Sequence, residues 1–275
     1  MAREQDKFAE AVMRRIRDFG RGEVVIKASR SMGESLLASA AATPPMGHPD
    51  FMNLLPGEVG SRDAVALFLD LRSFTARSFW DAPEEIIRVN VAVVSELAAS
   101  VQRHGGYVLG LRGDGVFACF DAAGSVDRRA MAAGVAMSAC ALALDSVKNA
   151  LNELLQISGI QPVQVRAGLD LGGLDFVRIG SSAGSEINVL GFAANFASKC
   201  EKVALAWEVV AGEALAAVLP NEDLTHHDYS PKQYTRGSET RNYRFFDVKW
   251  TRYLQHAAGI ANELGGRPVS AIGVL

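Results

Sequence analysis

The sequence predicts an α+β domain with a split β-α-β-β-α-β order of elements. Three features indicate this order: an apolar strand with a single acid at 64–71, a hairpin pattern at 107–120, and a long alanine-rich helix at 125–155. This order is that of ferredoxin-like domains, in which the end of the first strand and the turn of the hairpin lie side by side on one sheet. Further α and β elements follow this unit.

An extension at residues 1–58 precedes the predicted domain. Its first part has apolar side chains at Phe8, Val12, Ile16 and Phe19 among charged residues, which is the spacing of an amphipathic helix. The stretch 29–56 is rich in Ser, Ala, Gly, Pro and Met without a sustained period, so we expect a linker on the surface. The main domain is then expected at 59–250, followed by a tail at 251–275.

The elements of the main domain follow from turn and capping signals. After the first strand, Asp81 can cap a helix that has Pro83 just inside its start and ends at Gly105-Gly106. The next expected elements are the hairpin around Arg112-Gly113-Asp114-Gly115, the helix 125–155, a turn at 159–162, and two strands, VQVRAGLDL and FVRIG, around Gly172-Gly173. A helix at 191–203, a strand at 207–210, a short helix up to Leu219 and a last strand at 243–248 complete the domain.

Composition excludes several classes of protein. The formal net charge is -3 with a pI near 6.0, so no basic excess is available for a nucleic-acid backbone. Cys119, Cys140 and Cys200 are scattered, which argues against disulfides or a structural zinc site. The uncharged stretch Ala130–Leu144 is too short to span a bilayer, so we expect a buried helix and no membrane insertion. These features favour a cytoplasmic protein.

Asp70 and Asp114 are the candidate metal ligands. An acid inside an apolar strand, as Asp70 is, requires a hydrogen bond, an ion pair or a metal ion. A hydrogen bond from Arg72 or a nearby amide is one alternative, and the Gly-Asp-Gly around Asp114 is also a common hairpin turn. Together, however, two carboxylates at neighbouring strand ends form a site suited to Mg²⁺ or Mn²⁺. Such ions usually also bind substrate phosphates, so the pair predicts metal-assisted phosphoryl transfer, with donor amides in the turn after Asp70.

Four segments then resemble a known family. In order, FLDLRSFT, GDGVFACF, VRAGLDLGGLDFVRIGS and INVLGFAANFASKCEK are similar to the catalytic domain of class III nucleotidyl cyclases. The spacing between Asp70 and Asp114 also matches that family, and the resemblance covers about 59–248. Four blocks in the same order are much more specific than any single motif.

The resemblance implies a role for each matching residue. Asp70 and Asp114 would hold two divalent cations, Mn²⁺ or Mg²⁺. Asn195 would orient the ribose and stabilise the transition state, although a hydrogen bond between helices is an alternative for it. The remaining matches concern the triphosphate. The backbone at Phe74 and Thr75 would reach it, and Arg236 would contact its terminal phosphates. The side chain of Arg166 would lie near it, although a structural ion pair is an equal alternative for this residue. The resemblance also implies a homodimer, with the metals held by one subunit and Asn195 supplied by the other.

Departures from the family pattern bear on activity and substrate. Lys199 stands where the family has a transition-state arginine, so the charge is kept and the bidentate geometry is lost. Gly110 and Asn188 stand where adenylyl and guanylyl cyclases have their base-reading side chains, so neither purine pattern is present. Asn188 can offer a donor and an acceptor to a smaller ring, and Arg112 is a further candidate near the base or the phosphates.

The combination is similar to the pyrimidine cyclases of Pycsar antiphage defence. That resemblance implies conversion of UTP to 3′,5′-cyclic UMP, which would signal to a separate effector. Two alternatives stay open: a cytidylate cyclase acting on CTP, and a catalytically silent domain that binds a nucleotide as a sensor. Outside these blocks, we expect His226 and His227 to be surface residues without metal-ligand spacing.

Overall fold

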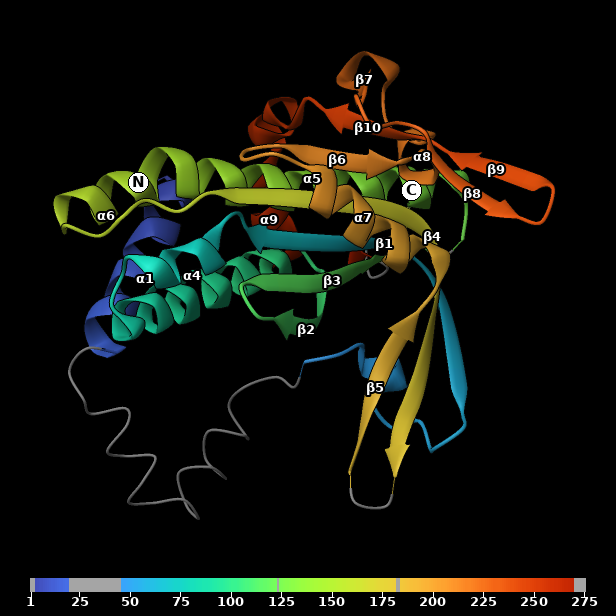
Figure 1. The fold of residues 1–275 in the computed structure, drawn as a ribbon, viewed down its shortest axis with the longest axis horizontal. Coiled ribbons are helices and arrows are strands. Elements are labelled where there is room, and N and C mark those ends of the chain that lie inside the picture. Colours follow the sequence, from blue (N-terminus) through green and yellow to red (C-terminus); the bar gives the residue numbers. More distant parts are fainter. Residues whose placement is uncertain (1–2, 20–45, 123, 182–183, 270–275) are drawn as a thin grey trace.

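The computed structural model describes residues 3–19, 46–122, 124–181 and 184–269. Its main sheet has the strand order β2-β3-β1-β4-β6-β10-β7, and β5 pairs with β4 beside this path (Figure 1). The strands are β1 (Val59–Leu71), β2 (Tyr107–Arg112), β3 (Gly115–Asp121), β4 (Val165–Ser181), β5 (Gly184–Leu190), β6 (Val209–Gly212), β7 (Leu224–His226) and β10 (Phe245–Val248). Strands β8 (Lys232–Arg236) and β9 (Glu239–Tyr243) form a separate two-stranded sheet.

The helices connect these strands and cover both faces of the sheet. The α-helices are α1 (Glu4–Phe19), α4 (Pro83–Arg103), α5 (Val126–Ser146), α6 (Asn152–Ile157), α7 (Phe192–Val203), α8 (Glu213–Ala216) and α9 (Leu254–Leu264). Short helical turns are η1 (Pro49–Phe51), η2 (Phe74–Phe79), the π-helical η3 (Val147–Leu151), η4 (Asn221–Asp223) and η5 (Trp250–Tyr253).

The predicted split β-α-β-β-α-β core is confirmed. Strand β1 pairs antiparallel with β3 on one side and with β4 on the other, and β2 pairs with β3, so the order β2-β3-β1-β4 is the ferredoxin-like one. Strand β6 then extends the sheet parallel to β4.

Strand β1 separates two hydrophobic cores. Its residues Val65, Leu67, Leu69 and Leu71 pack with helices α1, α4 and α5 in the larger core, whereas Ala64, Ala66 and the half-buried Phe68 pack with α7. Because successive side chains of a strand point to opposite faces, Asp70 lies on the same face as Phe68, the face that α7 covers only in part.

The amino-terminal helix and the carboxy-terminal segment are both packed against this core. The predicted face of α1 is confirmed for Phe8, Val12 and Ile16, which are buried against α4, α5 and η3, whereas Phe19 at the end of the helix is only partly buried. The residues called the tail form η5 and α9, and α9 packs on α5. Most of the expected linker lies outside the described residues, and its last part is on the surface except for two anchors: Phe51 is buried, and His48 is 2% exposed and contacts Phe51 and Tyr107.

Several details of the elements differ from the sequence prediction. The expected break at Gly172-Gly173 is wrong, because β4 runs through it and pairs with β1 there, Ala64 opposite Gly172 and Asp63 opposite Gly173. The helix α4 is preceded by Ala82 rather than capped by Asp81, whose carboxylate instead pairs with Arg77. Strand β5 and the β8–β9 hairpin were not predicted at all.

Among the described residues, one helical run, 126–157, is by length and composition long and apolar enough to cross a membrane. In the structure it forms α5, η3 and α6, and 78% of its most apolar window is buried inside the protein. The expectation of a buried helix at Ala130–Leu144 is confirmed.

Candidate active site

Asp70 and Asp114 lie next to each other, as predicted. Asp70 is the penultimate residue of β1 and pairs with Gly115, while Asp114 is in the β2–β3 turn and its carbonyl accepts the N–H of Leu71 at 3.1 Å. Burial, and then the Asp70 carboxylate, raise the pKa of Asp114. A Cβ atom on Gly115 would lie 2.8 Å from the Leu69 carbonyl and 3.1 Å from Asp70 Oδ1, so this close approach requires glycine.

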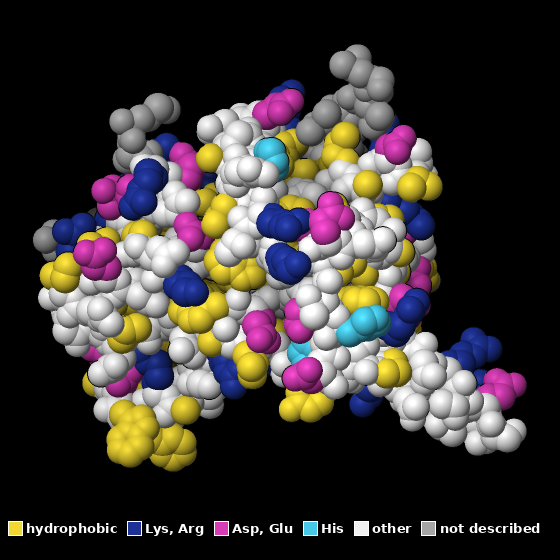
Figure 2. Space-filling view, turned by 90° about the horizontal axis from the view of Figure 1, so that it is seen from above, with side chains coloured by type: hydrophobic (Ala, Val, Ile, Leu, Met, Phe, Trp, Pro, Cys, Tyr) yellow, Lys and Arg dark blue, Asp and Glu magenta, His cyan; other side chains and the backbone are white. Residues whose placement is uncertain are grey.

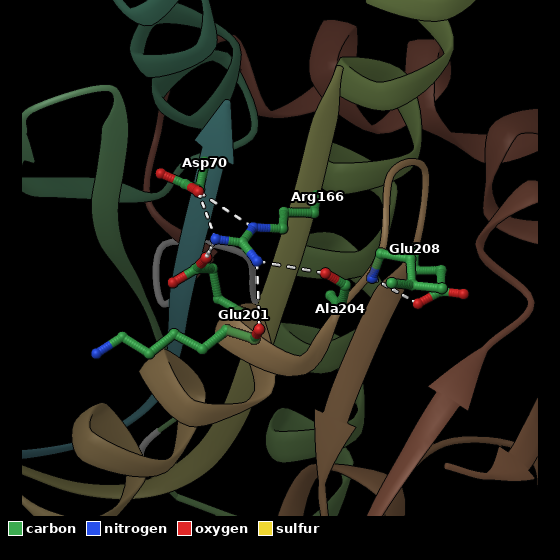
Figure 3. Close-up of polar contacts among 7 residues, drawn as sticks. Asp70, Arg166, Glu201, Ala204 and Glu208 are labelled. Carbon is green, nitrogen blue, oxygen red and sulfur yellow. Dashed lines mark hydrogen bonds and ion pairs between the residues drawn. The ribbon is translucent and has the colours of Figure 1, made fainter. Parts of the chain in front are cut away.

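Arg166 on β4 holds the Asp70 carboxylate from one side (Figure 3). Its Nε and Nη2 donate hydrogen bonds to Asp70 Oδ2 at 3.1 and 2.9 Å, and its Nη2 also lies 2.5 Å from Glu201 Oε1 on α7. Its Nη1 donates to the carbonyl oxygens of Lys202 and Ala204. The guanidinium therefore links the end of β1 to the last turn of α7.

Glu201 is a site residue that the sequence analysis missed. It is buried, and burial followed by the nearby Asp70 raises its pKa to about 7, although Arg166 acts in the opposite direction. Its charged neighbours Lys199 and Lys202 give the segment the composition of a solvated helix face. The signal was its helical position: Ala194 and Ala197 share its side of α7, and both are buried.

A hollow of about 490 Å³ lies between α7 and the strand ends that carry these groups. It unites Asp70, Asn195, Asn188 and Arg112, four of the predicted site residues. The remaining lining residues are Phe68, Leu69, Gly115, Val116, Phe117, Val189, Leu190, Ala194, Ser198, Glu201 and Lys202. Aromatic and aliphatic side chains next to paired carboxylates are the lining expected for a ligand with a flat ring at one end and negative charge at the other.

The predicted residues of α7 lie on its exposed side. Asn195, Lys199 and Lys202 are exposed and one turn apart, and the Asn195 side chain has no hydrogen bond to any described residue. The alternative reading of Asn195 as a bond between helices therefore has no support among the described residues. A smaller neighbouring hollow of about 160 Å³ is lined by Lys199 together with Lys202 and Lys232.

Arg236 is not brought to the carboxylates within one chain. It is the last residue of β8, exposed at the tip of the β8–β9 hairpin, which projects from the body of the molecule (Figures 1 and 2). Its predicted contact with phosphates therefore requires a second chain or a movement of the hairpin.

The turn after Asp70 offers backbone donors, as expected. Phe74 and Thr75 begin η2, so no residue of that turn can accept the hydrogen bonds of their N–H groups. Ser73 precedes them with a φ of 57°, and the buried Phe74 ring anchors the turn in the core. The two N–H groups are thus held within a few residues of Asp70.

A second group of potential metal ligands does not fit a metal ion. Glu208, His227 and Asp247 bring ligand atoms within 4.8 Å of one another, and the expectation of a surface position is wrong for His227, which is 7% exposed. However, the Tyr229 N–H donates to His227 Nδ1 at 3.1 Å, so in the neutral ring Nε2 carries the proton. Because Nε2 faces Asp247 at 3.7 Å, we assign no metal to this cluster.

The donors around Asp70 do fit a divalent cation. All are oxygens, and Arg166 engages only Oδ2 of Asp70, so Oδ1, on the Gly115 side, is available together with Asp114. Residues 59–245 match the family model described as the adenylate and guanylate cyclase catalytic domain. The chain belongs to this family. Catalytic domains of this family bind nucleoside triphosphates, use divalent metal ions and work as dimers.

Individual relatives of this cyclase domain agree with the assignment. "Adenylate cyclase 1" of Rhizobium meliloti (strain 1021) is 27% identical over 140 residues, which are 51% of this chain and 20% of the relative, so the match spans about a fifth of that protein. The adenylyl cyclase CyaB from P. aeruginosa is similar in structure with a TM-score of 0.58 and 20% identity, over 70% of this chain and 95% of that one. The guanylyl cyclase Cya2 gives 0.56 and 20% identity, over 70% and 94%.

Proposed function

We propose that the chain is a nucleotidyl cyclase that converts UTP to 3′,5′-cyclic UMP and pyrophosphate. The observation that carries this proposal is the hollow with Asp70 in its lining and with Asp114 and the η2 amides beside it. It supplies carboxylates for cations, donors for phosphate and an apolar wall for a base. The similar proteins are described as adenylyl or guanylyl cyclases. The proposal differs from them in the base, because Gly110 has no side chain to reach a purine edge.

In the proposed reaction the ribose 3′-oxygen attacks the α-phosphorus and pyrophosphate leaves. Two divalent cations, Mn²⁺ or Mg²⁺, held by Asp70 and Asp114 would supply Lewis acidity to the attacking oxygen and to the triphosphate. The N–H groups of Phe74 and Thr75 bind phosphate oxygens, and Arg166 adds positive charge beside them. Asn195 orients the ribose, and Lys199 stabilises the charge that develops in the transition state.

The assembly proposed for this reaction is a homodimer with shared sites. Asp70, Asp114 and the η2 turn belong to one subunit, and the exposed Asn195, Lys199 and Arg236 come from the other. The exposed position of Arg236 supports this arrangement, because a hairpin that projects from one chain can reach the site of another. By resemblance to Pycsar cyclases, we propose a cytoplasmic enzyme whose cyclic UMP signals to a separate effector in antiphage defence.

A second candidate function is a catalytically silent domain that binds a nucleotide. Lys199 in place of the arginine favours it, and a structure described as a class III adenylyl cyclase-like ATP-binding protein from Pseudomonas aeruginosa is similar to this chain. That similarity has a TM-score of 0.57 with 21% identity, over 66% of this chain and 40% of that one. A cytidylate cyclase, which makes cyclic CMP from CTP, is the third candidate.

The test is incubation of the purified chain with ATP, GTP, CTP or UTP and Mn²⁺, with cyclic product identified by mass spectrometry. We expect cyclic UMP as the main product. Cyclic CMP would support the cytidylate alternative, and a purine product would contradict the role given to Gly110. Binding of a triphosphate without any cyclic product would favour the silent domain.

A further inference from the structure

Tyr243 joins the β8–β9 hairpin to the body of the chain. It is the last residue of β9 and pairs with Lys232 at the base of the hairpin, whereas Arg236 lies at the other end of β8 (Figure 1). Its phenolic oxygen lies 3.0 and 3.2 Å from the two carboxylate oxygens of Asp170 and accepts the N–H of Ala214 at 2.9 Å. One hydroxyl group therefore links the hairpin to β4 and to α8. We call the contact between Tyr243 and Asp170 the hairpin anchor.

Asp170 is a buried acid that the proposed reaction does not use. The backbone N–H groups of Leu171 and Leu215 donate to its Oδ1 at 2.9 and 3.4 Å, and among the described residues Tyr243 is the one side chain that donates to it. A Cβ atom on Gly212 would lie 2.4 Å from the Asp170 Cγ, so the carboxylate is packed closely against the end of β6. Because a buried carboxylate requires its donors, this fixed group holds the Tyr243 hydroxyl in place.

The Tyr243 ring also packs on α7. Its centroid lies 4.7 Å from that of Phe192 and 4.3 Å from that of Phe196, and both contacts are edge-on. Phe192 meets Tyr234 of β8 in the same way, with centroids 6.2 Å apart. Both strands of the hairpin therefore contact the beginning of α7, the helix that carries Asn195.

The orientation of the hairpin depends on its base. All of β8 is exposed, and so is β9 as far as Asn242, so the hairpin beyond its base has little buried surface to hold it. Beside Tyr243, Arg244 pairs with Glu213 on the surface, where an ion pair contributes little. Arg236 is separated from the base by about 13 Å of strand. A small rotation at Tyr243 therefore becomes a larger displacement at Arg236.

We propose that Tyr243 and Asp170 are positioning residues that hold the β8–β9 hairpin against α7. This inference rests on the proposed function, in which Asn195, Lys199 and Arg236 of one subunit act together at the site of the other. The hairpin anchor fixes Arg236 relative to the two α7 side chains, so that all three reach the substrate at the same time. Neither Tyr243 nor Asp170 touches the substrate.

Tyr243→Phe removes the hydroxyl group of the anchor and keeps the ring on α7. With Mn²⁺ and the triphosphate that the wild type converts best, we expect kcat/KM to fall by about fivefold to tenfold, the effect of losing one hydrogen bond to a carboxylate. Tyr229→Phe is the matched control. Tyr229 is 73% exposed and its hydroxyl has no hydrogen bond to a described residue, so the same change there should leave kcat/KM unaltered.

A double-mutant cycle with Arg236 separates positioning from a general loss of structure. Arg236→Ala already removes the group that the anchor positions, so adding Tyr243→Phe should lower kcat/KM by less than about twofold further. If Tyr243 only stabilises the fold, the two losses multiply and the positioning role is wrong.

Limited cleavage by trypsin measures the hairpin directly. Lys232, Arg236 and Arg241 are exposed cleavage sites within it. Loosening the base should raise the cleavage rate at these sites severalfold in Tyr243→Phe and not in Tyr229→Phe. If Tyr243→Phe does not fold, Asp170→Asn provides the same tests, because one amide oxygen then replaces the two carboxylate oxygens that accept three donors.

The inference and the proposed function can fail separately. If the wild-type chain makes a cyclic nucleotide and Tyr243→Phe keeps its kcat/KM within about twofold, the positioning role is wrong and the cyclase assignment stands. If the wild-type chain makes no cyclic nucleotide but Tyr243→Phe is cleaved faster within the hairpin, the hairpin anchor stands and the cyclase assignment is wrong.

Discussion

Arg166 donates two hydrogen bonds to the same oxygen of Asp70, Oδ2, from Nε at 3.1 Å and from Nη2 at 2.9 Å. The other oxygen, Oδ1, points to the Gly115 side, where the Asp114 turn lies. The two oxygens of the Asp70 carboxylate therefore face different elements, Oδ2 towards Arg166 on β4 and Oδ1 towards the β2–β3 turn. An ion pair with Arg166 and a metal site with Asp114 are compatible at Asp70.

Replacing either acid with its amide should abolish the reaction. Asp70→Asn and Asp114→Asn keep the size of the side chain and remove the charge that holds a cation, so we expect product formation to fall by more than about a hundredfold. The increase in melting temperature on adding Mn²⁺ should disappear as well. The control is Asp175→Asn, an exposed acid on β4 outside the hollow. Robust turnover by either active-site variant would rule out the two-metal assignment.

Gly168 allows α7 to lie directly on β4. A Cβ atom there would be 2.0 Å from the backbone nitrogen of Glu201 and 2.3 Å from the carbonyl of Ala197, so Gly168→Ala must displace the helix. We expect a loss of about 2–3 kcal/mol in the free energy of unfolding and a lower kcat, because Asn195 and Lys199 move with α7. Gly173→Ala, on the same strand with no atom within 4 Å of its added Cβ, is the matched control. If Gly168→Ala changes neither the free energy of unfolding measured in urea nor kcat, α7 does not depend on the missing side chain at Gly168.

The sequence was sufficient to predict the core of the fold because each core element is specified by signals within its own segment. The apolar strand at 64–71, the hairpin and the alanine-rich helix each carry their own periodicity and turn signals, and the structure contains all three. Gly172-Gly173 misled the prediction, since glycine pairs commonly end strands. Here they remain in β4, and Gly172 lies against Ala193 of α7, with an added Cβ only 3.3 Å from that side chain.

The site was predictable only where its residues stand out in their own segments. Asp70 is an acid in an apolar strand and Asp114 an acid in a glycine turn, so both could be found from sequence. For Glu201 the helical position indicates only burial, and its place in the site depends on Arg166, which lies in a different element.

The buried Asp170 should make stability depend on pH. It is fully buried on β4, and burial raises its pKa to about 7, although Leu171 N–H, Tyr243 O–H and Leu215 N–H all donate to it. Its pKa in the unfolded chain is about 3.9, so between about pH 4 and pH 7 the folded state binds more protons than the unfolded state. Stability contributed by this group is therefore greatest below about pH 4 and falls by up to about 1.4 kcal/mol per pH unit as pH rises towards 7.

Asp170→Asn isolates this contribution, because the amide is neutral throughout. Urea unfolding at pH 5 and at pH 7.5 should show a smaller difference between the two pH values for the variant than for the wild type. The exposed Asp175→Asn should behave like the wild type. An equal pH dependence in Asp170→Asn and the wild type would show that Asp170 is ionised in the folded protein at both pH values.

A mixed dimer decides whether Asp70 and Asn195 act from the same chain. Both residues line one hollow within a single chain, yet Asn195, Lys199 and Arg236 are exposed, as residues that serve a partner's site must be. Asp70→Ala and Asn195→Ala subunits should each be inactive as homodimers. If the site is shared as proposed, their mixed dimer has one site with both defects and one with neither, so about half of the wild-type activity per dimer should return. If both residues act within one chain, every site keeps a defect and no activity returns. Purifying the mixed dimer through two different affinity tags and measuring product by mass spectrometry separates these outcomes.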